Sequence, residues 1–258
     1  MNINDVNELL KNKITREEYI ECFKVISEEI NNHKTDGIIK TLVNLKEQVI
    51  INELYSSRID IIFINILFIR AYLYQNVAWR ARSFVNECIE LLEDVKFDKD
   101  LMMGAEIYKI LGDASSCYLD CATSYICYGH SVSLYLETDY PLEYTTYVAR
   151  SMIIAINQLP NRDEIIPTDE EIKDTFKEYS DIIIKAKNGI GYIKHDKVEQ
   201  TKEFQDVYDE VMEEVEIIAS KNNVNIPQYK WMLMADALLK RGIVWKSPQV
   251  MNPKVKFD

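Results

Sequence analysis

The chain has 258 residues, of which 47% are hydrophobic and only 7 are Gly and 6 are Pro. Its 42 acidic and 30 basic residues give a formal net charge of -12. This charge disfavours binding to nucleic acid, because such binding depends on neutralising phosphates with Lys and Arg.

The cysteines and the apolar runs indicate the cellular compartment in which we expect the protein. Five cysteines form an odd set without the density of a disulfide framework, which predicts reduced thiols. The first residues contain no apolar signal segment, so we expect a cytoplasmic protein. The most apolar run, residues 61–69, is far shorter than the ~20 residues that cross a bilayer, so no membrane partner is expected.

The first part of the chain predicts helices joined in pairs. Residues 4–12 are expected to form a short helix, and Thr15 with Glu18 forms a capping box that opens a helix reaching about His33. Asp36 is expected to cap the next helix, which reaches about Leu54. These elements predict a first helical hairpin.

Three further pairs are expected before residue 160. The second pair covers residues 57–76 and 78–94, and its first helix is apolar nearly all round, so neighbours must cover it. The third pair begins after Asp98, turns at 113–116 and ends near Glu137. The fourth pair begins at Tyr140-Pro141, with proline at the first helical position.

A regular spacing runs through these pairs, since Tyr72, Tyr108 and Tyr144 lie 36 residues apart. The third block reads Ala105-x-x-Tyr108-x-x-Leu111-Gly112, and the fourth opens with Tyr140-Pro141-Leu142-Glu143-Tyr144. Over residues 58–160 this pattern resembles the tetratricopeptide-type helical repeats. The resemblance implies an all-α fold in which antiparallel helical hairpins stack into a superhelix with a concave face.

The composition changes after Pro160, which predicts a helical-repeat region over residues 1–160 and an acidic helical region over 161–258 packed on it. Residues 161–220 hold 17 Asp and Glu against 8 Lys and Arg. A second capping box, Thr168 with Glu171, opens a helix expected to reach Asn188. A linker at 189–196 and two more helices follow, and the tail from Ile243 is expected to be extended, because prolines oppose a helix there.

Catalytic and metal-binding patterns are absent from the sequence as we interpret it. The three histidines are scattered, and the pair His195-Asp196 is better explained as a surface loop than as a metal site. Cys117 and Cys121 lie four residues apart, which indicates buried thiols rather than a zinc site. We therefore expect no cofactor, no metal and no enzyme.

The resemblance to helical repeats suggests where a partner would bind. It would place five charged residues of the second and third pairs along the concave surface. These candidate partner-binding residues are Arg70, Arg80, Glu106, Lys109 and Asp113.

The acidic surplus favours a basic protein partner. The leading hypothesis is a bacterial immunity or regulatory protein that neutralises a basic toxin or effector. A peptide-sensing scaffold and an enzyme with an unpatterned site remain the alternatives.

Overall fold

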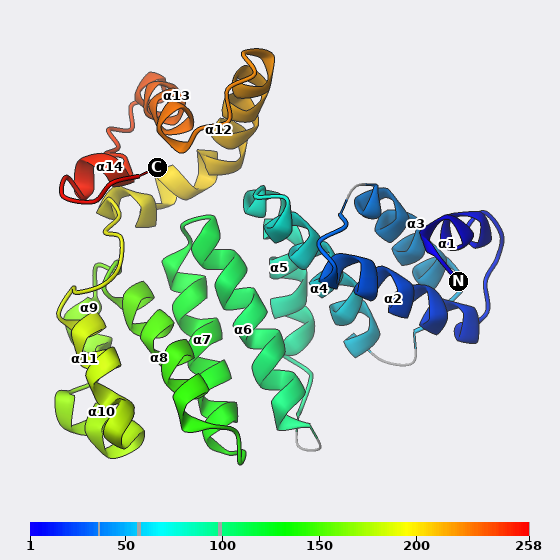
Figure 1. Ribbon diagram of the computed structural model, residues 1–258, viewed down its shortest axis with the longest axis horizontal. Helices are drawn as coiled ribbons and strands as arrows, with labels where there is room; N and C mark the ends of the chain where they lie inside the picture. The colour runs from blue at the N-terminus through cyan, green and yellow to red at the C-terminus, as the bar shows by residue number, and fades with distance from the viewer. Residues whose placement is uncertain (36, 56–57, 98–99, 258) are drawn as a thin grey trace. The chain divides into compact units, whose positions relative to one another are not determined.

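The structure is a computed structural model that describes residues 1–35, 37–55, 58–97 and 100–257. These residues form helices, turns and loops, with no strand among them, so the all-α prediction is confirmed (Figure 1). The chain forms two compact units, Met1–Asp100 and Leu101–Asp258. The boundary expected after residue 160 falls inside the second unit, where residues from both of its sides share one core.

The first unit is a small helical cluster built around α4. Its helices are α1 (Ile3–Leu9), α2 (Arg16–Asn31), α3 (Ile38–Ile51), α4 (Arg58–Tyr74), the 3-10 turn η1 (Ala78–Ala81) and α5 (Arg82–Leu92). Helix α4 packs against α2, α3, α5 and η1. This arrangement explains why α4 is apolar nearly all round, since each of its faces meets another helix.

Local capping chemistry sets the start of α2, as the sequence predicts. Thr15 accepts the backbone N–H of Glu18, and the Glu18 carboxylate accepts the backbone N–H of Thr15. The adjacent Arg16 joins this end of α2 to α4, donating to both carboxylate oxygens of Asp60 at 2.9 and 3.0 Å. Asp36, the expected cap of α3, lies outside the described residues.

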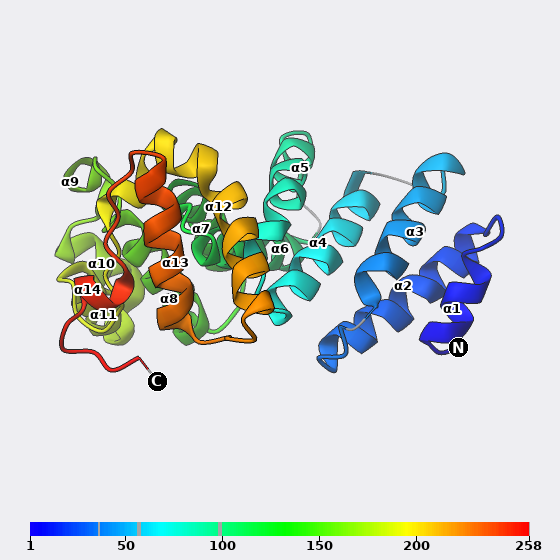
Figure 2. The same cartoon turned by 90° about the horizontal axis from the view of Figure 1, so that it is seen from above.

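The second unit contains the remaining helices. They are α6 (Leu101–Cys117), α7 (Cys121–Leu136), α8 (Leu142–Ile156), α9 (Arg162–Ile165), α10 (Asp169–Phe176), η2 (Lys177–Tyr179), α11 (Ser180–Lys187), η3 (Lys197–Gln200), α12 (Lys202–Lys221), α13 (Pro227–Lys240) and α14 (Pro248–Met251). Consecutive helices α6, α7 and α8 pack against one another, and α8 also packs against α11. Figure 2 shows α12 and α13 as a separate hairpin of the same unit.

The turn between α6 and α7 lies later than predicted. Helix α6 continues through the expected turn at 113–116 to Cys117, because Ala114 and Ser115 are fully buried helix positions. The chain turns at 118–120, where Leu119 adopts a φ of 67°. Cys117 and Cys121 therefore lie on different helices, and Cys117 is exposed, so the expectation of two buried thiols is correct for Cys121 alone.

The helix expected from Thr168 to Asn188 is interrupted. Its capping box forms as predicted, with Thr168 and Glu171 exchanging hydrogen bonds. Helix α10 then ends at Phe176, and Lys177 adopts a φ of 49° before α11 begins at Ser180. Two short helices replace the single long one.

The C-terminal tail is not extended throughout, and it docks on its own unit. Pro248 opens the short helix α14, where its missing N–H costs nothing at a helix start. Trp245 is buried, and the Asn252 side chain bonds both the N–H and the carbonyl of Lys194 at 2.9 and 2.7 Å. The tail therefore forms part of the second unit's fold.

The three recurring tyrosines occupy related but unequal positions. Tyr72 packs toward Phe84 of α5, and Tyr108 stacks on His130 of α7 with ring centroids 4.8 Å apart. Tyr144 instead meets a tyrosine of α7, the helix that precedes its own. The 36-residue spacing thus does not correspond to one repeated contact, and the tetratricopeptide-like superhelix stays a proposal.

None of the described helices is both long enough and apolar enough to span a membrane.

Gly112 is required where α6 meets α7. A Cβ at this position would lie 2.8 Å from two ring carbons of Tyr128, which is closer than carbon atoms approach without strain. The ring cannot easily move, because the Tyr128 hydroxyl donates to Asp113 at 2.8 Å. We expect Gly112→Ala to destabilise the protein by about 1–3 kcal/mol in a urea titration followed by circular dichroism.

Gly129 of α7 provides the matched control. A Cβ there meets only the sulfur of Met152, at an ordinary contact distance of 3.8 Å. Gly129→Ala should be neutral or stabilising by up to about 1 kcal/mol, since alanine favours helix. Equal effects of the two substitutions would contradict the tight α6–α7 contact.

Candidate functional site

The predicted partner-binding residues fall into two groups that belong to different units. Arg70 of α4 donates to the side-chain oxygen of Asn31 at 2.5 Å. Arg80 of η1 is exposed and lies over the Trp79 ring, with its guanidinium carbon 5.0 Å from the ring centroid. Both arginines are therefore engaged within the first unit.

The other three predicted residues share one face of α6, as their spacing of three and four residues requires. Lys109 donates to Asp113 at 2.8 Å, and Asp113 also accepts the hydroxyl of Tyr128 from α7. Glu106 accepts the hydroxyl of Tyr135 from α7. The structure thus brings these charged residues into two hydrogen-bonded groups with tyrosines of α7, and the two groups together form the polar network between α6 and α7.

The surroundings of this network shift the pKa of two tyrosines and of one lysine. Burial raises the pKa of Tyr128 and Tyr135, and the carboxylates that accept their hydroxyls raise it further. For Lys109, burial alone lowers the pKa, but the hydrogen bond and charge of Asp113 outweigh it, so the pKa is raised. The tyrosines stay protonated as donors and Lys109 stays charged, so the network cross-links α6 and α7 at neutral pH.

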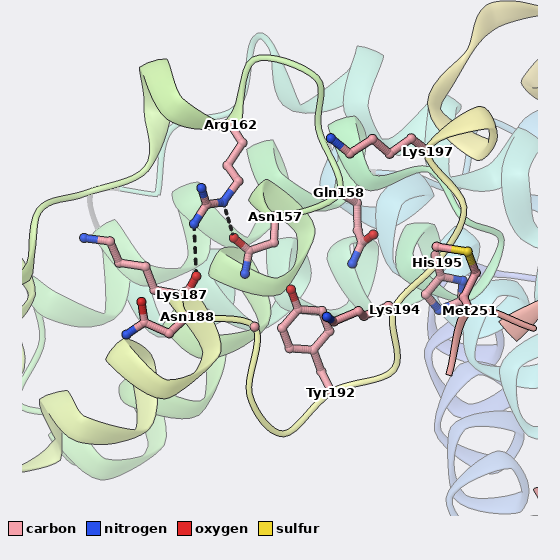
Figure 3. A pocket seen from close by; sticks show the side chains of 11 residues that line it. Asn157, Gln158, Arg162, Lys187, Asn188, Tyr192, Lys194, His195, Lys197 and Met251 are labelled. Atoms are coloured by element: carbon pink, nitrogen blue, oxygen red, sulfur yellow. Dashed lines mark hydrogen bonds between the residues drawn. The ribbon is translucent and has the colours of Figure 1, made fainter. Parts of the chain in front are cut away.

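A pocket of about 450 Å³ forms elsewhere in the second unit, where the ends of several helices meet. The residues that line it are Asn157, Gln158, Arg162, Lys187, Asn188, Gly189, Tyr192, Lys194, His195, Lys197 and Met251. They come from the ends of α8 and α11, from α9 and α14, and from the 188–197 segment (Figure 3). No Asp or Glu occurs among these described lining residues.

Hydrogen bonds fix one wall of the pocket. Arg162 donates from Nε to the Asn157 side chain at 2.6 Å and from Nη2 to the Lys187 carbonyl at 3.0 Å. Asn157 in turn donates to the carbonyl of Ala186 at 2.8 Å. The C-terminal ends of α8 and α11 are thereby held together, and Figure 3 shows both bonds of Arg162.

Glycine sets the course of the opposite wall. Gly189 adopts a φ of 76° after α11, where its N–H bonds the carbonyl of Ala186 and the next N–H bonds that of Lys185. This geometry ends the helix and sends the chain across the pocket as the 190–196 segment. Burial raises the pKa of Tyr192 in this segment, an effect that Asn157 and Arg162 reduce in part.

A buried carboxylate lies behind the pocket. Glu199 of η3 is fully buried, accepts the indole N–H of Trp245 at 2.6 Å and lies 3.1 Å from Nδ1 of His195. The two groups do not form a hydrogen bond, so Nδ1 of His195 and Oε2 of Glu199 are both buried without a hydrogen-bond partner among the described residues. His195 was expected to lie in a surface loop, but one side of its ring faces the buried Glu199.

Burial makes the thiols of three described cysteines weaker acids than a free cysteine. Burial raises the pKa of Cys121 and Cys127 to about 12, and nearby carboxylates add to the effect. The pKa of the Cys22 thiol rises to about 11 for the same main reason. A nucleophilic cysteine needs a lowered pKa, so these thiols lack the property that catalysis requires.

No group of three or more His, Cys, Asp or Glu side chains that could hold a metal ion is found among the described residues. Asp196, which the sequence pairs with His195, instead accepts the backbone N–H groups of Val198 and Lys246 at 3.2 and 2.8 Å. It caps η3 and fixes the tail.

The sequence analysis did not predict the residues that line the pocket as binding residues. Their only signal was that Arg162, Lys187, Lys194 and Lys197 supply half of the 8 basic residues in the acidic segment 161–220.

A scan against models of known protein families, a search of curated proteins and a search of solved structures find no protein that matches this chain.

Proposed function

We propose that this protein acts by binding rather than by catalysis, and that an acidic face of α12 holds a basic protein partner. In a bacterial setting, an immunity or regulatory protein that neutralises a positively charged toxin or effector would act in this way. The peptide-sensing scaffold is a weaker candidate, because the polar groups it would use on α6 are already bonded to one another.

The observation that carries the proposal is a stripe of carboxylates along α12. Glu203, Asp206, Glu210 and Glu213 are exposed and recur at spacings of three and four residues, so they share one helical face. The opposite face buries Phe204, Tyr208, Val211 and Val215. Like charges at this spacing repel one another and cost helix stability, and a basic partner would relieve that cost.

The distribution of charge in residues 161–220 also favours a basic partner at α12. Basic residues of this segment line the pocket and not the α12 stripe. Arg241 of α13 forms an ion pair with Glu210 of the stripe at 3.0 Å. A negative surface of this kind steers positively charged partners toward it and accelerates their association.

The test begins by capturing the partner from the native host at low ionic strength and identifying it. We expect a basic protein whose association rate falls steeply with salt, because screening weakens long-range attraction. Neutralising the stripe with Glu203→Gln, Asp206→Asn and Glu213→Gln should slow association by about ten-fold or more at low salt.

A matched variant separates the stripe from the overall charge. Glu17→Gln, Glu21→Gln and Glu28→Gln remove the same three charges from exposed positions of α2. This variant should associate at close to the original rate. An acidic partner, or a rate that salt leaves unchanged, would refute the proposed function.

A further inference from the structure

The pocket in the second unit has a charge opposite to that of the chain around it. The protein carries a formal charge of -12, yet the described residues that line the pocket include one Arg, three Lys and one His and no acid. Basic side chains that merely solubilise a surface would be interspersed with acidic ones. Their gathering around one cavity indicates a site for an anion.

The cations at the pocket are not equally available. Lys187 bonds Asp169 at 2.6 Å, and Figure 3 shows its amine pointing away from the other lining residues. Arg162 bonds Asn157, the Lys187 carbonyl and the exposed carboxylate of Asp163. These two side chains mainly build the wall.

Two lysines remain to bind a ligand. Lys194 and Lys197 form no ion pair within the part of the chain that the structure describes, and both are exposed. In the view of Figure 3, Lys194 points toward Tyr192 and Lys197 extends back over Gln158. Both amines therefore lie on the pocket side of the segment that carries them.

The backbone that carries these lysines is held in place. Asn252 bonds both the N–H and the carbonyl of Lys194. Asp196, between the two lysines, accepts hydrogen bonds from Val198 and Lys246 and does not line the pocket. The arrangement thus presents two positive charges and turns the intervening negative charge away.

We infer that this pocket binds a small phosphate monoester, with its phosphate between Lys194 and Lys197. A phosphate monoester carries a charge of about -1.5 to -2 at neutral pH, which matches two lysines. Lysine binds phosphate as a point charge, whereas flat carboxylates favour the paired donors of arginine, and those of Arg162 are largely engaged.

The other lining residues suit the organic part of such a ligand. The Tyr192 ring and the Met251 thioether offer apolar contact, while Asn157, Gln158 and Asn188 offer neutral hydrogen-bonding groups. The volume of about 450 Å³ falls within the usual range of small-molecule sites. A nucleic acid is disfavoured, because its further phosphates would meet the surrounding acidic surface.

The test uses phenyl phosphate as the probe and isothermal titration calorimetry on the full chain. Phenyl sulfate, a monoanion of nearly the same shape, isolates the second charge, and inorganic phosphate isolates the ring. We expect phenyl phosphate to bind more tightly than either. Succinate and a short single-stranded oligonucleotide test the carboxylate and polymeric alternatives, and we expect both to bind more weakly.

Substitutions then locate the site. Lys194→Gln and Lys197→Gln should each weaken phenyl phosphate binding about ten-fold, the effect of one lost charge-assisted hydrogen bond, and the double variant should abolish it. Lys185→Gln, at an exposed lysine of α11 that does not line the pocket, should leave binding unchanged. Tyr192→Leu should weaken phenyl phosphate more than inorganic phosphate.

These positions are exposed lysines, so unchanged circular dichroism is expected for both lysine variants and their control. No binding of phenyl phosphate, equal binding of phenyl sulfate, or full binding by K194Q/K197Q would overturn the assignment. This inference does not depend on the α12 stripe, and the variants of each site leave the other intact.

Discussion

Replacing Glu199 by alanine should lower the free energy of unfolding by about 3–5 kcal/mol, because a buried hydrogen-bond acceptor is lost and a cavity is left in its place. Glu199 is 0% exposed, and its two carboxylate oxygens face the indole N–H of Trp245 and the ring of His195. Truncation would leave the indole N–H of Trp245 buried without an acceptor and would open a cavity.

The loss should extend beyond these contacts because η3 joins separated parts of the second unit. Gln200, the next residue, bonds the N–H of Cys121 at 3.1 Å and the carbonyl of Leu119 at 2.9 Å. Trp245 belongs to the C-terminal tail. Displacing η3 would therefore loosen the tail and the α6–α7 turn together, and hydrogen exchange should show reduced protection at both.

Glu199→Gln is the control that separates charge from hydrogen bonding. Its amide oxygen can still accept the indole N–H of Trp245, and its side chain has nearly the volume of glutamate. We expect a loss below about 1.5 kcal/mol, because the hydrogen bond is kept and no cavity opens. Urea titrations followed by tryptophan fluorescence compare the variants, and an alanine variant as stable as the parent would disprove this account.

The features that the sequence predicted correctly are those determined by neighbouring residues. Both capping boxes join residues three apart, so Thr15 and Thr168 could be read without knowledge of the fold. The buried face of α12 also follows a regular spacing, with Phe204, Tyr208 and Val211 three or four residues apart and all buried.

The misplaced turn shows what neighbouring residues do not reveal. The small residues at 113–116 resemble a turn, yet they let α6 and α7 approach closely. The actual turn uses Leu119 in a left-handed conformation, which leucine disfavours. Gln200 and Gln205 hold its carbonyl from about 80 positions away in the chain, at 2.9 and 3.0 Å. Such a contact is invisible before the fold is known.

The pocket also could not be predicted from the sequence, because it depends on contacts between residues far apart in the chain. Its lining combines residues near 157, 190 and 251, and the bonds between Asn252 and Lys194 cross 58 residues. The predicted site on α6 could be found because Glu106, Lys109 and Asp113 lie on adjacent turns of one helix. A helix face is readable from spacing, whereas a cavity between helix ends depends on the packing of the whole unit.

Replacing Phe68 by alanine should destabilise the first unit by about 3–5 kcal/mol, the usual cost of removing a buried aromatic ring. Phe68 is 1% exposed on α4 and stacks on Phe84 of α5, with ring centroids 4.2 Å apart and planes at 12°. The substitution removes burial, stacking and the contact that joins the two helices. Urea titration with circular dichroism measures the loss.

Phe63 provides a matched control on the same helix, because its side chain is only partly buried and its nearest described ring, Phe23, lies 6.3 Å away. Phe63→Ala should cost clearly less than Phe68→Ala, and Phe68→Leu should recover part of the loss by refilling the volume. If Phe68→Ala leaves an apolar cavity, benzene should bind there and raise the melting temperature of that variant alone. Equal losses at positions 63 and 68 would contradict the deeper burial of Phe68 and its closer contact with Phe84.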